Sequence, residues 1–140
     1  MAWPWVNRKD AQPAAGTRDG DRARTGRAGE ALAQRYLESR GLRVLERNYR
    51  VARGRSRQGG EIDLILLDRE GTLVFAEVRV RRGGFGGGAA ASVVAAKQAS
   101  LIYAAQTYLS RLDRLPPCRF DVVAVDGDRV QWLKAAFDAA

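Results

Sequence analysis

Two apolar runs joined by a glycine-containing triplet constrain the fold of this chain of 140 residues more than any other feature. The runs cover residues 61–68 and 72–81, and both are rich in residues that favour β-strands. The triplet, residues 69–71, suits a three-residue hairpin loop in which Gly71 takes a positive φ. The pattern predicts an antiparallel hairpin, and pairing outward from Asp68 and Thr72 places Asp63 opposite Glu77.

The predicted hairpin has two unlike faces, because neighbouring residues of a strand point to opposite sides. We expect one face to be the core, since all of its residues are apolar: Ile62, Leu64, Leu66, Val74, Ala76, Val78 and Val80. The other face mixes apolar and charged residues: Glu61, Asp63, Ile65, Leu67, Phe75, Glu77, Arg79 and Arg81. A register slip of one residue would separate the two opposed acids.

The rest of the chain is predicted to form two helices and three further strands. The helices are expected at 27–40 and 90–112, and the strands at 42–50, 119–126 and 129–133. Because the second helix crosses between strands, the strand at 119–126 should lie parallel to that at 72–81. This order, α-β-β-β-α-β-β, predicts an α/β domain over residues 25–140, with a mixed sheet flanked by helices. Residues 1–24 lack an apolar period and are expected to form a flexible tail.

Composition narrows the chemistry that such a domain can perform. The chain has no histidine and one cysteine, Cys118, which excludes catalytic triads, zinc sites of His or Cys, and an internal disulfide. Any hydrolytic site must therefore use carboxylates, Lys or Arg, and a hard cation such as Mg²⁺. The net charge of +8 favours nucleic acid as the partner, although a merely solubilising charge is the alternative. The sequence lacks a signal peptide and an apolar run of roughly 18 residues, which predicts a cytoplasmic protein without a membrane span.

The opposed acids Asp63 and Glu77 are the candidate metal site. Like charges this close are destabilising unless a cation neutralises them, and two carboxylates with waters and the backbone carbonyl of Val78 suit Mg²⁺. Arg79 would then contact a phosphate. The alternative is a solvated strand face on which the two acids pair with Arg79 and Arg81.

Several motifs in this order resemble the YraN-like family of uncharacterised bacterial proteins, over residues 26–137. The segments that carry the resemblance are Gly60-Glu61-Ile62-Asp63-Leu64-Ile65, Leu73-Val74-Phe75-Ala76-Glu77-Val78-Arg79, Gly26-Arg27-Ala28-Gly29-Glu30, Asn48-Tyr49-Arg50, Phe85-Gly86, Lys97, Arg119-Phe120-Asp121-Val122-Val123 and Ala136-Phe137. That family resembles nucleases of the PD-(D/E)xK type and Holliday junction resolvases. The resemblance implies a restriction-endonuclease-like αβββαβ core.

The resemblance also implies roles for individual residues. Asp63 and Glu77 would bind Mg²⁺ or Mn²⁺, and Glu30 would complete the site from the first helix; the alternative for Glu30 is a first-turn acid that complements the helix dipole. Arg79 stands where the family pattern has lysine, and an arginine cannot act as a base near neutral pH. Lys97 either replaces that lysine in space or is an exposed helix cation.

Basic residues around the hairpin are the candidate nucleic-acid contacts: Arg50, Arg53, Arg55, Arg57, Arg81 and Arg82. A solvated loop without a ligand is the alternative for residues 51–60. Three functions remain open: a metal-dependent nuclease acting on DNA, including branched or damaged DNA; a DNA-binding module that has lost turnover; and a protein-interaction scaffold. Whether the protein is an enzyme is therefore open, and a homodimer is expected only by analogy with resolvases.

Overall fold

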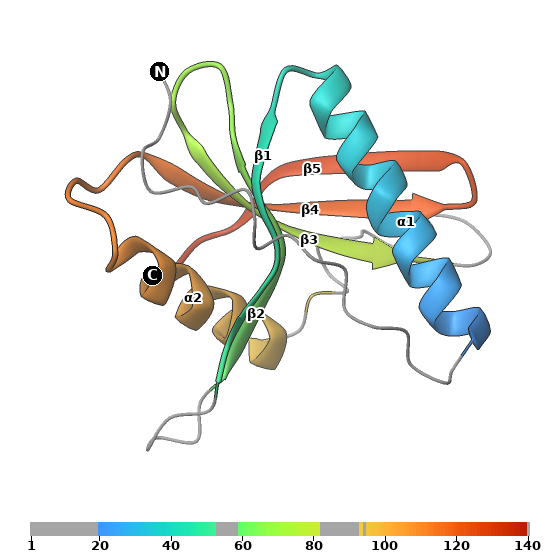
Figure 1. Cartoon of the computed structure of the whole chain (residues 1–140), viewed down its shortest axis with the longest axis horizontal. Helices are drawn as coiled ribbons and strands as arrows, with labels where there is room; N and C mark the ends of the chain where they lie inside the picture. The colour runs from blue at the N-terminus through green and yellow to red at the C-terminus, as the bar shows by residue number, and fades with distance from the viewer. Residues whose placement is uncertain (1–19, 53–58, 82–92, 94, 140) are drawn as a thin grey trace.

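The computed structural model describes residues 20–52, 59–81, 93 and 95–139 (Figure 1). Within these residues the chain forms α1 (Gly20–Ser39), β1 (Arg43–Val51), β2 (Gly60–Leu67), β3 (Leu73–Val80), α2 (Ala95–Leu109), β4 (Cys118–Asp126) and β5 (Arg129–Phe137). The predicted element order and the α/β class are confirmed. Neither helix in the described part of the chain combines the length and apolarity needed to cross a membrane.

The five strands form one mixed sheet in the order β1-β2-β3-β4-β5. β3 and β4 are parallel, as the crossover through α2 predicts, and the other neighbouring strands are antiparallel. β1 and β2 run steeply across the direction of β3, β4 and β5 in Figure 1, so the sheet twists strongly between β2 and β3. This arrangement is consistent with the αβββαβ core that the resemblance implies.

Element boundaries differ from the prediction mainly at the helices. α1 begins at Gly20, seven residues before the predicted Arg27, so residues 20–24 belong to the helix and not to a tail. Residues 1–19 lie outside the described part. α2 covers 95–109 and is shorter than the predicted 90–112, while β5 continues to Phe137, past the predicted end at residue 133.

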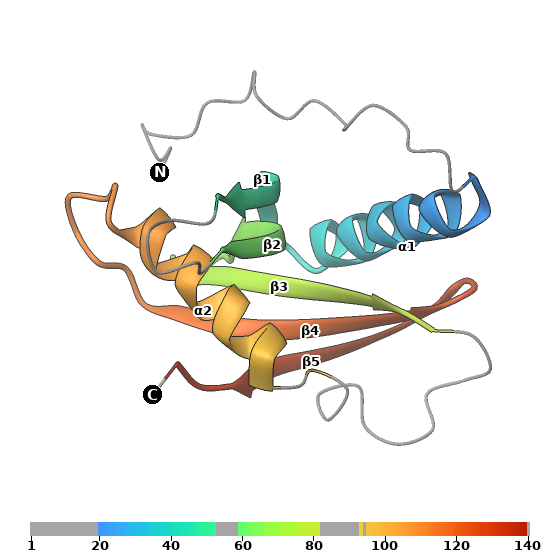
Figure 2. The same ribbon diagram turned by 90° about the horizontal axis from the view of Figure 1, so that it is seen from below.

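The predicted apolar face of the hairpin is buried, and Ile65 and Phe75 of the other face are core as well. α2 packs on a cluster that includes Ile65 and Phe75, which are 0% and 1% exposed, and α1 packs on a cluster that includes Leu66 and Val74. Figure 2 shows the two helices as separate layers against the strands. A crossover helix has to cover one face of a sheet, which is why Ile65 and Phe75 are buried despite the charged residues on their face.

The hairpin between β2 and β3 has the predicted register over its paired part. Gly71 has φ 87°, and the pairs run from Leu67↔Leu73 to Leu64↔Ala76. The side chain of Asp68 holds the loop, because its Oδ1 accepts the backbone N–H groups of Glu70 and Thr72, each at 2.9 Å. These bonds use the preference of aspartate for turns to fix the hairpin loop.

Beyond Leu64↔Ala76 the two strands diverge, and the predicted backbone pairing of Asp63 with Glu77 is absent from the recorded register. Ile62 and Ile65 both pack in the cluster under α2, although residues three apart on a regular strand face opposite sides. The pleat of β2 is therefore broken at this point. We call the region where residues 60–63 of β2 and 77–80 of β3 separate the fork.

Two glycines bring the helices close to the fork. A Cβ on Gly60 would lie 2.6 Å from the carbonyl oxygen of Ser100 and 2.8 Å from Cβ of Ala104, so β2 starts in direct contact with α2. A Cβ on Gly29 would clash with Val80 at the end of β3, so α1 passes equally close on the other face. Side chains larger than hydrogen at these positions would push the helices away from the fork.

Candidate active site

Asp63 lies in the fork with 9% of its surface exposed. Its Oδ2 accepts the backbone N–H of Val78 at 2.8 Å, a bond that takes the place of a backbone ladder bond between β2 and β3. The N–H and C=O of one strand residue point to the same side, so the carbonyl of Val78 also faces the fork. The broken pleat therefore gathers a carboxylate and a backbone carbonyl at one place.

Glu77 meets Asp63 from β3 and is only 4% exposed. It lies between Ala76 and Val78, which face α1, so its side chain points toward α2. There its Oε1 is 3.6 Å from Nζ of Lys97, the third residue of α2. Its Oε2 is buried and has no hydrogen-bond partner among the described residues. The acids are buried, so the alternative of a solvated strand face is wrong.

Burial raises the pKa of both acids, and the charge of Asp63 adds to the rise at Glu77. Desolvation is the largest cause for Glu77, followed by the charge of Asp63, and together they raise its pKa from 4.5 to about 8, while Lys97 and Arg79 pull it down. Desolvation also raises the pKa of Asp63, and the bond from Val78 opposes that rise. A hydrogen bond between the two carboxyl groups contributes to both values. Without a cation, the pair retains a proton near neutral pH.

Glu30 approaches the pair from α1. Desolvation, and then the charges of Asp63 and Glu61, raise its pKa from 4.5 to about 7, while Arg50 lowers it. Because α1 starts at Gly20, Glu30 lies in the third turn, and the alternative of a first-turn acid that complements the helix dipole is wrong. The structure thus places Glu30 within electrostatic reach of Asp63.

The oxygen atoms around the fork are of the kind that hard divalent cations prefer. No three side chains of His, Cys, Asp or Glu come together as a metal-binding group in the part of the chain that the structure describes. The possible ligands are the carboxylates of Asp63 and Glu77 and the backbone carbonyl of Val78. Oε2 of Glu77 has no hydrogen-bond partner among the described residues. Mg²⁺ is commonly held by one or two carboxylates and keeps several waters, so this oxygen set suits Mg²⁺ or Mn²⁺ and does not suit zinc.

The remaining predicted residues are distributed around the fork. Lys97 is at the site, with 31% of its side chain exposed, and Arg79 is close enough for its charge to lower the pKa of Glu77. Arg50 is largely exposed, and its Nε is 3.5 Å from Oε1 of Glu61. The backbone N–H of Arg81 bonds to the carbonyl of Val125 at 2.7 Å. The other predicted contacts lie outside the described residues: Arg53, Arg55, Arg57 and Arg82.

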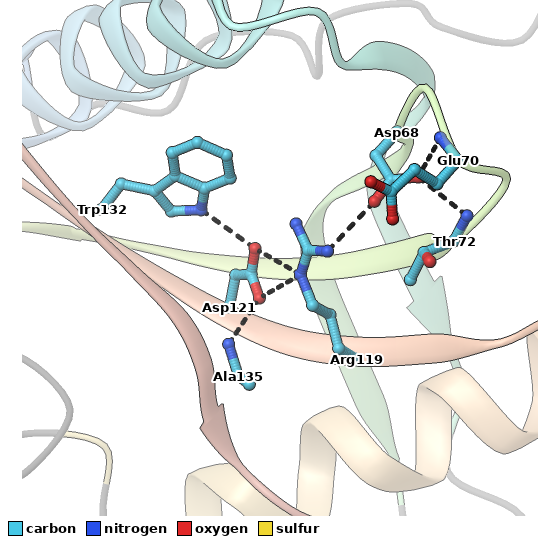
Figure 3. A network of polar contacts seen from close by, with 7 residues as sticks. All are labelled: Asp68, Glu70, Thr72, Arg119, Asp121, Trp132 and Ala135. Atoms are coloured by element: carbon cyan, nitrogen blue, oxygen red, sulfur yellow. Dashed lines mark hydrogen bonds and ion pairs between the residues drawn. The ribbon is translucent and has the colours of Figure 1, made fainter.

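A third buried acid, Asp121 of β4, was not predicted as a polar centre. Its carboxylate is fully buried and accepts bonds from Nε of Arg119 at 3.0 Å, Nε1 of Trp132 at 2.9 Å and the backbone N–H of Ala135 at 2.9 Å (Figure 3). Arg119 also donates to Oδ2 of Asp68 at 3.1 Å. An acid inside the apolar run 119–126 was the only sequence signal for this network, which ties β4 and β5 to the hairpin loop.

The metal-free protein is expected to lose stability as the pH rises from about 5 to about 8. The folded state holds protons on Glu77 and Glu30 that the unfolded chain has released, so raising the pH through this window favours unfolding. We expect the free energy of unfolding to fall by on the order of 2 kcal/mol across it. Thermal melting in EDTA at a series of pH values measures the effect.

Glu77→Gln is the matched variant for this test, because it removes the main titrating carboxyl without a change of shape. Its melting temperature should depend much less on pH, and Mn²⁺ should stabilise the parent but not the variant. A parent protein whose stability in EDTA rises over the same range would contradict the raised pKa values.

Comparison with known proteins places the chain among bacterial relatives. A family model described as "Uncharacterised protein family UPF0102" matches residues 29–125. A UPF0102 protein of Methylibium petroleiphilum is 56% identical over 115 residues, which are 82% of this chain and 94% of that protein. A UPF0102 protein of Paracidovorax citrulli is 52% identical over 134 residues, 96% of this chain and 97% of that protein. The matched region contains both acids of the fork, Glu30 and Lys97.

Proposed function

We propose that this chain, which belongs to the uncharacterised protein family UPF0102, the YraN family, is a nucleic-acid-binding protein that cleaves DNA with the help of Mg²⁺ or Mn²⁺. The observation that carries the proposal is the buried pair of Asp63 and Glu77. One oxygen of Glu77 lacks a partner among the described residues, and repulsion from Asp63 contributes to its raised pKa. Burying two acids in this way is costly for a purely structural site and is resolved by a cation.

In the proposal, Asp63, Glu77 and the carbonyl of Val78 hold the cation, and Glu30 adds negative charge from α1. When bound, such a cation lowers the pKa of a coordinated water and offsets the charge that develops on a phosphate. Lys97 takes the role of the motif lysine, because its ammonium group reaches Glu77 from α2. Arg79 keeps the positive charge of the motif position but acts only as a phosphate contact.

The substrate is expected to be held mainly through its phosphates. The net charge of +8 and the arginines around the fork favour a polyanion, and such binding weakens as salt is raised. The proposed contacts are Arg50, Arg53, Arg55, Arg57, Arg81 and Arg82. Because these residues would contact the phosphate backbone, we expect the protein to select DNA by its structure, such as a branch or a lesion, and not by its base sequence.

Cleavage of linear, nicked and four-way-junction DNA tests the proposal. The parent should cut at least one of these substrates with Mg²⁺ or Mn²⁺ and not in EDTA. Asp63→Asn and Glu77→Gln should each lower the rate by roughly 100-fold or more, since each removes a cation ligand. Glu70→Gln, which changes an exposed acid of the hairpin loop, is the matched control and should cut like the parent.

Arg79 favours a second candidate, a DNA-binding module of this fold that has lost turnover. In that case the parent binds DNA without cutting it, and Arg79→Lys restores cleavage. A parent that neither binds nor cuts DNA at low salt would contradict both candidates and would leave the protein-interaction scaffold. Gel filtration with and without junction DNA tests the homodimer expected by analogy with resolvases.

A further inference from the structure

Four side chains on the α1 face of the sheet form what we call the cation–aromatic surface: Tyr36, Arg40, Trp132 and Lys134. The rings of Tyr36 and Trp132 meet edge to face, with centroids 6.3 Å apart. Arg40 lies 4.9 Å from the ring centroid of Tyr36, and Lys134 lies 4.4 Å from that of Trp132. Two cations are therefore held over two adjoining rings that belong to α1 and β5.

The local geometry follows from the sequence spacing. Tyr36 and Arg40 are four residues apart, which places them on the same side of α1 and its C-terminal turn. Trp132 and Lys134 are two residues apart on β5 and so share a face of that strand. Glu38, the acid nearest to Tyr36 in sequence, is two residues away and projects from another side of the helix.

The buried network around Asp121 holds the indole ring of Trp132 in place. Its indole Nε1 donates to Oδ2 of Asp121, as does Nε of Arg119, and the backbone N–H of Ala135 donates to Oδ1 (Figure 3). The ring therefore has little freedom. Because Lys134 rests on this fixed ring, its side chain loses less conformational entropy when it binds an anion. If these side chains only stabilised the fold, the ring of Trp132 and Asp121 would be sufficient. A structural role does not explain why Arg40 and Lys134 lie exposed over the two rings.

Neither Arg40 nor Lys134 forms an ion pair with an acid among the described residues. Both side chains are exposed. The aromatic rings beneath them carry no net charge, so the two cations keep their full positive charge. This leaves two positioned cations on a protein with a net charge of +8. Their chemistry suits a polyanion with closely spaced charges, such as a nucleic-acid backbone.

The surface lies close enough to the fork to bind the same ligand. Val78 pairs with Val123 and Val123 pairs with Trp132, so Trp132 is two strand spacings, or about 10 Å, from the residue that bonds Asp63. Along α1, Tyr36 is about 9 Å from Glu30. Each strand of duplex DNA carries one phosphate per about 3.4 Å of helix axis, so a stretch of duplex about 10 Å long presents roughly three phosphates of one strand.

We propose that the cation–aromatic surface is a second contact for the sugar–phosphate backbone of a nucleic acid, separate from the fork. The inference rests on the proposed function for its ligand and does not depend on turnover. It assigns Arg40 and Lys134 to phosphates that flank the bond at the fork. Tyr36 and Trp132 position these two cations.

The test measures the salt dependence of binding to a labelled DNA duplex, and to the corresponding single strand, with Ca²⁺ in place of Mg²⁺. We expect Arg40→Gln/Lys134→Gln to bind on the order of tenfold more weakly at low salt, and the slope of log K against log salt to fall by about two. Arg111→Gln/Arg114→Gln removes the same charge from the segment between α2 and β4, and should keep the parent's slope. Melting curves check that all variants are folded.

A second measurement leaves the surface intact. With Trp3→Phe and Trp5→Phe, Trp132 is the only tryptophan of the chain, and its emission should change when the oligonucleotide binds. Unchanged emission, or a Gln variant that keeps the parent's affinity and slope while the parent binds DNA, overturns the inference and leaves the proposed function standing. A reduced slope without any cleavage by the parent supports the surface and contradicts the nuclease. A parent that does not bind DNA overturns both.

Discussion

Replacing Lys97 with methionine is expected to lower the rate of DNA cleavage by roughly 100- to 1,000-fold, the usual cost of removing one charged group that stabilises the transition state. Lys97 is the lysine whose Nζ lies 3.6 Å from Glu77, and it reaches the acid pair from α2 rather than from β3. Methionine keeps the length of the side chain and removes only its charge. Rates at saturating DNA with Mn²⁺ measure the effect.

Arg79→Met is the matched control, because it removes the charge at the position where the family pattern has lysine. If Lys97 has taken over the role, Arg79→Met should lower the rate by less than about tenfold and should weaken binding more than turnover. DNA binding in Ca²⁺ by Lys97→Met should stay near that of the parent. A large loss of rate in Arg79→Met with little loss in Lys97→Met would reverse the assignment of the two cations.

Asp121→Ala should destabilise the protein by about 3–5 kcal/mol, because the substitution leaves buried donors without an acceptor. Arg119, Trp132 and the backbone N–H of Ala135 all bond to this carboxylate, which is completely buried. Arg119 would keep only Asp68, at 3.1 Å. Urea denaturation, followed by circular dichroism, measures the free energy of unfolding.

Asp128→Ala is the control for this substitution, since Asp128 is exposed in the turn between β4 and β5. It should change the free energy of unfolding by less than about 0.5 kcal/mol. A loss below about 1 kcal/mol in Asp121→Ala would show that the network around Arg119 contributes little to the fold.

The sequence was sufficient for the topology because local patterns determine it. The triplet before Thr72 fixes the hairpin and, with it, the register from Leu67↔Leu73 to Leu64↔Ala76. The helical segment between β3 and β4 is long enough for a crossover, which makes these strands parallel. The same register places Asp63 and Glu77 directly after its last pair, Leu64↔Ala76, although the two acids are not themselves paired.

Three features depended on contacts between distant segments and were missed. The fork arises where the twist between β2 and β3 ends their pairing, and side-chain alternation does not reveal where a pleat breaks. Burial of the acid pair depends on α2, which covers the face that carries Ile65 and Phe75. The network of Asp121 was not predicted, because two of its partners, Trp132 and Ala135, reach the carboxylate only through the pairing of β4 with β5.

The position of Lys97 could be suspected but not decided from sequence. A cation in a helix that is 20 residues away from Glu77 along the chain gives no local signal of contact. Its placement follows from the close approach of α2 to the start of β2, which Gly60 permits beside Ala104. The alternative of a merely exposed helix cation is not supported, since Nζ of Lys97 is 3.6 Å from Oε1 of Glu77 and 31% of its side chain is exposed.

The groups around the fork come from both strands of the hairpin and from helices on opposite faces of the sheet. Glu30 belongs to α1, Lys97 to α2, and Asp63 and Glu77 to β2 and β3. A partly folded chain that has formed only the hairpin would hold both acids without either flanking group. These four groups therefore come together only when both helices have packed on the sheet, and a transient detachment of α2 would remove Lys97 from the acid pair while the sheet remained intact.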